Sequence, residues 1–194
     1  MSFEINSAPI PAGSAIIGKV GIDQTTPGTT DSVTVKSQGY AAAVSLTRTA
    51  DTNAYTANDV IGAATGSTAA LTFAIAPSAG GQVMITSVAL ECDASAVISG
   101  EAGYRLYLYN VTPPSALGDN AAWDLPSGDR ASFLGFVDLG QPVDLGSTLY
   151  VETNGLQKQI TAASGNVFAY LVTLGAFTPA SATVRVITVH SVVV

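Results

Sequence analysis

The sequence predicts an all-β protein whose strands form two packed sheets. Apolar segments of strand length recur from about residue 43 to the end, separated by Gly, Pro, Asn, Asp and Ser. Several segments are apolar on both alternating faces, which is typical of strands covered on both sides. About eight such strands after a Gly- and Pro-rich beginning favour a jelly-roll-like sandwich with an extended N-terminal arm.

The pattern places the strand ends to within a few residues. We expect strands at 43–49, 70–76, 82–91, 104–111, 133–139, 148–153, 166–174 and 182–193. In 104–111, alternation puts two sets of side chains on opposite faces: Tyr104, Leu106 and Leu108, and Arg105, Tyr107 and Tyr109. A second layer must hide the outward aromatic rings, so Tyr107 and Tyr109 are candidates for a subunit interface.

Residues 1–40 differ in composition from residues 41–194, which we expect to form the β-sandwich domain. They are rich in Gly, Pro, Ser and Thr, and no helical or strand period runs through them. Pro cannot donate to a sheet ladder and Gly weakens a strand, so we expect an arm or small β-module. Its short apolar groups are further interface candidates: Ile16, Ile17, Val20 and Ile22.

The connection 112–132 is long for a compact sandwich and contains the only tryptophan, Trp123. A single helical turn is expected near 115–122. Two interpretations of Trp123 stand side by side: it contacts a neighbouring subunit or a larger assembly, or it folds back to cap its own sandwich.

Composition favours a protein that packs against copies of itself or a larger assembly. Only 11% of the 194 residues are charged and 47% are hydrophobic, against about 25% charged in an ordinary domain. The net charge of −7 and the seven scattered Lys and Arg residues argue against nucleic-acid binding. The beginning MSFEINSAPIPAG lacks the pattern of a secretory signal, and no apolar run reaches membrane-spanning length. We therefore expect a product made in a cytoplasm, with no membrane partner.

Catalytic and metal-binding chemistry finds little support in the residue types. His190 is the only histidine, and we expect a structural role for it rather than that of a general base. Cys92 stands beside Glu91 and Asp93, which disfavour a thiolate, so a packed thiol is expected. We predict no catalytic residues, no cofactor and no metal, and hence no enzyme.

The loop acids Asp119, Asp124 and Asp129, with Asn120, could offer oxygen ligands to Ca²⁺. Their spacing does not match an EF-hand loop, and turn-stabilising hydrogen bonds explain them more simply. A glycosidase pair among them has no positive support, because spacing in sequence does not show the separation of two carboxylates.

Two segments resemble a group of small structural proteins of tailed bacteriophages: RTADTNAYTANDVIGAATG at 48–66, and YLYNVTPPSALGDNAAWDLPSGDRASFLGFVDLG at 107–140. The chain is similar to capsid decoration, or cement, proteins with a jelly-roll body, and AIIGKVGID in the arm resembles short modules of phage virion components. The resemblance implies location in the virion, binding to the major capsid protein and assembly as a homotrimer on three-fold positions. It implies no catalytic residues.

Two other classes of function remain open. One is a receptor- or carbohydrate-binding module of a phage head or tail fibre, for which Tyr104, Tyr107, Tyr109 and Trp123 could supply a stacking surface. The other is a hydrolase of cell-surface polysaccharide, with Asp124 or Asp129 as the residues to test.

Overall fold

The computed structural model describes residues 38–63 and 68–194, and this part of the chain contains strands and no helix. The strands are β1 (Gly39–Thr47), β2 (Val60–Ile61), β3 (Leu71–Ala74), β4 (Gly81–Cys92), β5 (Tyr104–Tyr109), β6 (Phe133–Gly140), β7 (Val143–Asp144), β8 (Leu149–Ala162), β9 (Asn166–Thr173) and β10 (Val184–Val193). Within these residues no helix is long and apolar enough to cross a membrane.

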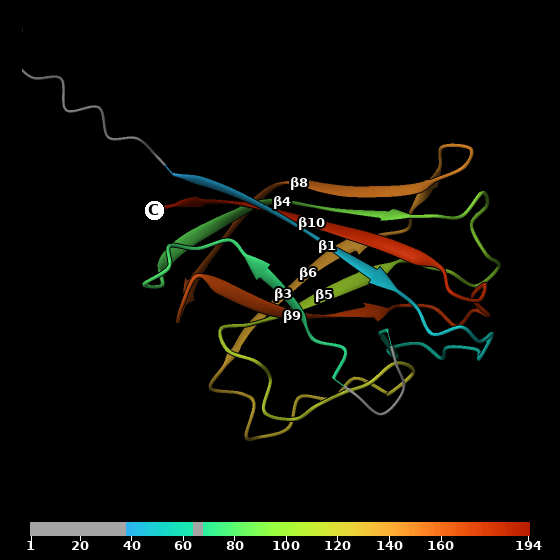
Figure 1. The fold of residues 1–194 in the computed structure, drawn as a ribbon, viewed down its shortest axis with the longest axis horizontal. Coiled ribbons are helices and arrows are strands. Elements are labelled where there is room, and N and C mark those ends of the chain that lie inside the picture. The colour runs from blue at the N-terminus through green and yellow to red at the C-terminus, as the bar shows by residue number, and fades with distance from the viewer. Residues whose placement is uncertain (1–37, 64–67) are drawn as a thin grey trace, which may run out of the picture. The chain divides into compact units, whose positions relative to one another are not determined.

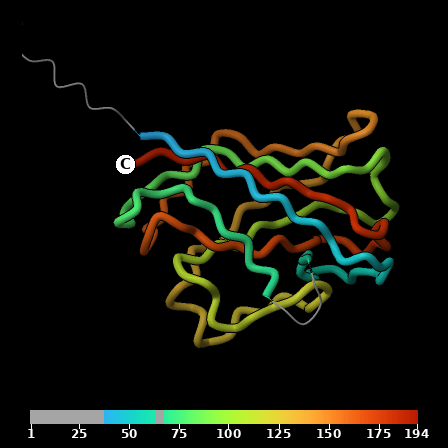
Figure 2. Tube along the Cα trace, in the orientation of Figure 1, coloured from blue at the N-terminus to red at the C-terminus, as the bar shows by residue number. Residues whose placement is uncertain are grey.

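The strands form two antiparallel sheets that pack face to face (Figure 1). One sheet has the order β1-β10-β4-β8-β7, and the other has the order β2-β9-β5-β6 with β3 also paired to β9. The eight longer strands pair as nested hairpins: β1 with β10, β3 with β9, β4 with β8, and β5 with β6. Figure 2 shows the outermost pair, where the blue β1 runs beside the red β10. Successive pairs fall in alternate sheets, which is the jelly-roll arrangement, so the predicted fold class is confirmed.

The main core lies between the two sheets. From β4, the side chains of Val83, Ile85, Val88 and Leu90 are each at most 1% exposed. The step of three between Ile85 and Val88 comes from a β-bulge at Thr86, which has no partner on either neighbouring strand. The bulge keeps both halves of this long strand facing the core.

All eight predicted strands are present, and most of their ends agree to within a few residues. The largest difference is β8, which continues to Ala162 instead of ending at 153, because its second half pairs with β4 although it is polar. The expected helical turn at 115–122 is wrong: the segment is largely irregular, with a turn at 119–120, where Asn120 has a left-handed conformation at φ 63°.

Strand β1 includes Gly39 and Tyr40, which precede the domain boundary expected at residue 41. The side chains of Tyr40, Ala42 and Val44 are partly buried and pack against the core. Residues 1–37, with the predicted arm contacts Ile16, Ile17, Val20 and Ile22, lie outside the described residues.

Deletion of residues 1–37 is expected to leave the thermal unfolding transition of the sandwich in place, because the residues from Gln38 onward contain both sheets and their core. Deletion of residues 1–43 serves as the matched control. It removes Tyr40 and Ala42, which we expect to cost on the order of 2 kcal/mol, or roughly 5 °C in midpoint. Calorimetry of both variants measures this, and loss of the transition in the shorter deletion would show that the first 37 residues belong to the core.

Candidate interaction surface

The sheet of β2, β9, β5 and β6 carries a second apolar cluster on its outer face, away from the main core. Its buried members are Val60, Ala69, Tyr107, Tyr109, Tyr170 and Val172. The opposite face of β5 lines the main core through Tyr104, Leu106 and Leu108. The alternation predicted for this strand is therefore confirmed, and both of its faces are covered.

The loop 112–132 covers the second cluster and lies under the sheet in Figure 1. The indole of Trp123 stacks on the phenol ring of Tyr107, with ring centres 3.6 Å apart and planes inclined by 14°. Leu117 and Leu125 of the same loop also pack against the cluster. In this chain the layer that hides the outward aromatic rings of β5 is thus its own loop.

Asp119 fastens the loop to the residues on both sides of β2. Its Oδ1 accepts hydrogen bonds from the Tyr55 hydroxyl at 2.6 Å and from the Gly62 amide at 2.8 Å. Its Oδ2 lies 3.8 Å from Nη2 of the buried Arg48, whose Nε donates to the Tyr55 hydroxyl at 2.7 Å. A Cβ on Gly62 would lie 2.6 Å from that of Ala69 and 3.1 Å from the Asp119 nitrogen, so only glycine fits there.

Asp129 closes the other side of the loop. Its carboxylate, in a residue only 2% exposed, accepts hydrogen bonds from the Ser115 amide at 3.2 Å and hydroxyl at 3.1 Å. The Tyr170 hydroxyl then accepts from the Leu117 amide at 3.2 Å and donates to the Ser115 carbonyl at 3.1 Å. Both ends of the loop are therefore hydrogen-bonded to one another and to the sheet beneath.

Backbone hydrogen bonds complete the attachment. The Val60 amide donates to Ala121, and the Trp123 amide donates to Asn58, both at 2.8 Å. The described part of 48–66 and the loop of 107–140 consequently form one structural unit.

These contacts account for two of the three acidic residues of the loop. Asp119 and Asp129 are buried and bonded within the chain, and Asp124 is exposed. Among the described residues, no group of three or more His, Cys, Asp or Glu side chains could hold a metal ion.

At the margin of the cluster, Arg105, Phe136 and Asp138 form the exposed rim of the sheet. The Arg105 guanidinium lies 4.2 Å from the ring centre of Phe136 and donates to Asp138 at 2.6 Å and to the Tyr107 hydroxyl at 3.2 Å. The hydrogen bond to Asp138 and that to Tyr107 raise the pKa of Arg105, so its charge is fixed. Phe136 is 44% exposed.

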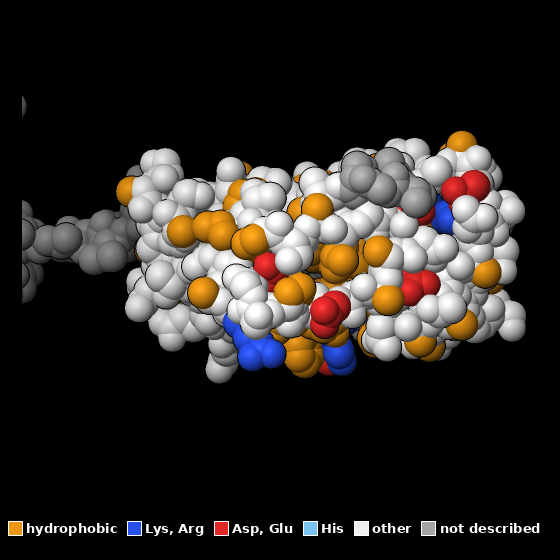
Figure 3. Space-filling model, turned by 90° about the horizontal axis from the view of Figure 1, so that it is seen from below, with side chains coloured by type: hydrophobic (Ala, Val, Ile, Leu, Met, Phe, Trp, Pro, Cys, Tyr) orange, Lys and Arg blue, Asp and Glu red, His pale blue; other side chains and the backbone are white. Residues whose placement is uncertain are grey.

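We call Arg105, Trp123, Phe136 and Asp138 the rim surface. Exposed aromatic rings with a positioned arginine are the composition typical of binding hot spots. In Figure 3, which shows the side of the molecule on which the loop lies, hydrophobic side chains gather across the face with basic and acidic side chains among them.

The structure brings three of the predicted interface residues together. Tyr107 is 5% and Tyr109 1% exposed, so their rings are already covered within the chain, and Trp123 is half-buried. Their part in an interface between chains stays a prediction. Sequence reasoning placed Arg105 on the same face but gave no role to it or to Phe136, because their meeting depends on the pairing of β5 with β6.

His190 and Cys92 lie away from this surface. His190 is exposed on β10, not packed as expected, and the structure gives its ring no carboxylate partner among the described residues. Cys92 is buried, and desolvation raises the pKa of its thiol, in agreement with the predicted packed thiol.

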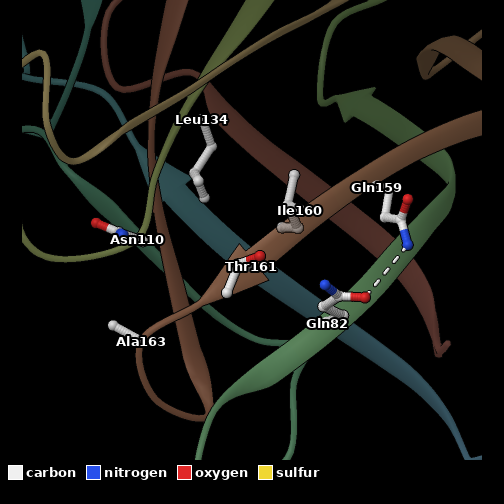
Figure 4. A pocket seen from close by; sticks show the side chains of 7 residues that line it. All are labelled: Gln82, Asn110, Leu134, Gln159, Ile160, Thr161 and Ala163. Carbon is white, nitrogen blue, oxygen red and sulfur yellow. Dashed lines mark hydrogen bonds between the residues drawn. The ribbon is translucent and has the colours of Figure 1, made fainter.

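A shallow groove of about 550 Å³ lies at one end of the sandwich (Figure 4). It is lined by Gln82, Asn110, Leu134, Gln159, Ile160, Thr161 and Ala163. Gln159 Nε2 donates to Gln82 Oε1 at 3.5 Å. The remaining amide and hydroxyl groups can hydrogen-bond a polar ligand.

The chain was compared with family models, curated proteins and solved structures. No family model and no curated protein matches the chain. Among solved structures, the chain is similar to one described as the native virion of Kashmir bee virus at neutral pH. The two share 15% sequence identity with a TM-score of 0.29, over 87% of this chain and 80% of that chain.

Replacing Trp123 with Ala is expected to lower the free energy of unfolding by roughly 3 kcal/mol, because it uncovers Tyr107 and the cluster below. The neighbouring exposed Asp124→Ala is the control and should change stability little. Urea unfolding measures both. Unchanged stability in Trp123→Ala would show that the ring does not cap the sheet.

Stability is expected to fall between about pH 10 and pH 12. Burial raises the pKa of Tyr109 to about 12 from an ordinary value of 10.0, and burial also raises the pKa of Tyr55. Above pH 10 the unfolded chain loses these protons while the folded chain keeps them, so ionisation favours unfolding. Tyrosinate absorbance should rise together with the loss of β-sheet circular dichroism; a rise to completion with the sheet intact would contradict the burial.

Proposed function

We propose that the chain is a virion structural protein that decorates and stabilises a bacteriophage capsid, binding the shell as a symmetric oligomer. The observation that carries the proposal is the rim surface, where an exposed Phe136 is held beneath a fixed Arg105 on a rigid sheet. Such a preorganised surface loses little side-chain entropy on binding, as a contact protein requires. It is the basis for a binding role rather than a catalytic one.

The proposal that the protein belongs to a phage particle rests on the resemblance of segments 48–66 and 107–140 to phage structural proteins. In the structure, the described parts of these segments are joined by Asp119 and by the backbone hydrogen bonds of Val60 and Trp123. Because the two segments form one structural unit, it is consistent that both resemble the same group of proteins. The major capsid protein is then the partner, and a homotrimer is the proposed assembly, in which repeated modest contacts add by avidity.

The groove favours a second candidate, a receptor- or carbohydrate-binding module of a head or tail fibre. Amide groups such as those of Gln82, Asn110 and Gln159 are suited to hydrogen-bond the hydroxyl groups of sugars. Trp123 is a weaker sugar platform, because Tyr107 already occupies one face of its indole.

Replacing Phe136 with Ser is expected to weaken binding to phage heads about 30-fold, or about 2 kcal/mol, with the melting temperature unchanged. Leu145, which is 65% exposed in the turn after β7, provides the control Leu145→Ser. Co-sedimentation of purified protein with heads that lack it gives the affinities. Equal binding by both variants would exclude the rim surface from the contact.

Gold-labelled antibodies against the chain then locate it on particles from a host that carries its gene. Regular labelling of heads supports decoration, and labelling of tails or fibres supports the second candidate. Unlabelled particles would overturn both.

A further inference from the structure

Strand β1 has one side turned away from its sheet. It pairs with β10 in a single continuous register from Gly39 with Val192 to Thr47 with Val184. At the two ends of this ladder, the Gln38 carbonyl accepts from Val193 and the Arg48 amide donates to Thr183, both at 3.0 Å. Since hydrogen-bonded pairs alternate along an antiparallel ladder, the even-numbered residues bond to β10. The odd-numbered residues from 39 to 47 direct their N–H and C=O groups to the free edge.

These outward groups have no hydrogen bond to any described residue, since β1 is terminal in its sheet and neither backbone nor side-chain bonds reach them. The side chains at the same positions are exposed and small: Gly39, Ala41, Ala43, Ser45 and Thr47. Nothing in them hinders the approach of another strand. An edge of this kind is a template for pairing with a further strand.

The other long edges in the described part of the chain carry features that prevent such pairing. Beyond its contact with β7, β8 presents Glu152 and Lys158 and a register shift opposite Thr86. The edge strand β6 presents Asp138 and two register shifts against β5. In contrast, β1 has nine residues with no charge, no proline and no bulge. Among these edges, β1 alone lacks protection.

We propose that the β1 edge pairs with the β1 edge of a second copy of this chain, antiparallel and two-fold symmetric about Ala43. This register sets Ala43 opposite Ala43, Ala41 opposite Ser45 and Gly39 opposite Thr47, so every outward group meets a partner and these hydrogen-bonded pairs are small. Between them, Ala42 lies opposite Val44 and Tyr40 opposite Leu46. A second copy fits because an uncharged strand of an acidic protein can face itself without repulsion of like charges. The partly buried Tyr40, Ala42 and Val44 on the inner face would be covered further by the second sheet.

The inference rests on the self-association proposed above and names the surface that carries it. Two β1 strands meet across a two-fold axis, which is separate from any three-fold contact. In trimers formed through another surface, the β1 edges would join one trimer to the next.

The test is amide hydrogen exchange of the full chain by NMR at two concentrations. The even-numbered amides of β1 bond to β10 and serve as protected internal references. Slow exchange at residues 41, 43, 45 and 47 that is lost on dilution, and lost in Ala43→Lys, is expected. Fast exchange at both concentrations overturns the proposal, and so does protection independent of concentration, which would place another part of the same chain on the edge.

Cross-linking tests the register. Opposed hydrogen-bonded residues have Cα atoms about 5.5 Å apart, within the span of a disulfide. Ala43→Cys should therefore give a covalent dimer on mild oxidation. Thr188→Cys, at the partner position of Ala43 on β10, should stay monomeric.

The two proposals fail separately. If Ala43→Cys gives no covalent dimer while antibodies still detect the protein on phage particles, the edge pairing alone is overturned. If the covalent dimer forms but antibodies detect the protein on no particle, the proposed function alone is overturned.

Discussion

The buried carboxylate of Asp119 is the contact on which the outer half of the molecule depends. The Tyr55 hydroxyl, the Gly62 amide and the Arg48 guanidinium all lie around this carboxylate. Asp119 as a whole residue is only 3% exposed. A buried charge is costly unless its hydrogen-bonding capacity is filled, and here both oxygens have partners. The hydrogen bonds of Asp119 therefore hold the loop 112–132 against the sheet, and the loop in turn places Trp123 on Tyr107, beside the rim residues of β5 and β6.

The covered second cluster also changes what the low charged fraction implies about the surface of the protein. A chain with so few charged residues suggests a large apolar surface in need of a partner. Much of that apolar content instead fills two layers inside one chain, the core between the sheets and the cluster under the loop. Among the described residues the exposed large hydrophobic side chains are Val111, Phe136, Val143, Leu145 and Val194. The proposed self-association would therefore use particular places, such as the rim surface or a strand edge, rather than a broad apolar face.

The sequence predicted the strands well because period-two alternation is a local property. The two-sided apolar character of 104–111 also predicted a second covering layer, although it did not distinguish the chain's own loop from another subunit. The polar second half of β8 was not predicted as a strand, because its place in the sheet comes from pairing with β4 and not from its own hydropathy. The partners of Asp119 could not be predicted either, because Tyr55 and Gly62 are 64 and 57 residues away and meet it only in the folded chain.

Nested pairing limits the order in which the strands can pair while the chain is being synthesised. Among the four nested pairs, β5 with β6 has the shortest connection, and each surrounding pair joins residues farther apart until Gly39 meets Val192. Closing such distant contacts is slow because chain entropy is lost before they form. During translation β1 emerges before every strand that separates it from its ladder partner β10. A nascent chain thus carries an uncharged strand without its ladder partner until β10 has been synthesised, and the sandwich closes only then.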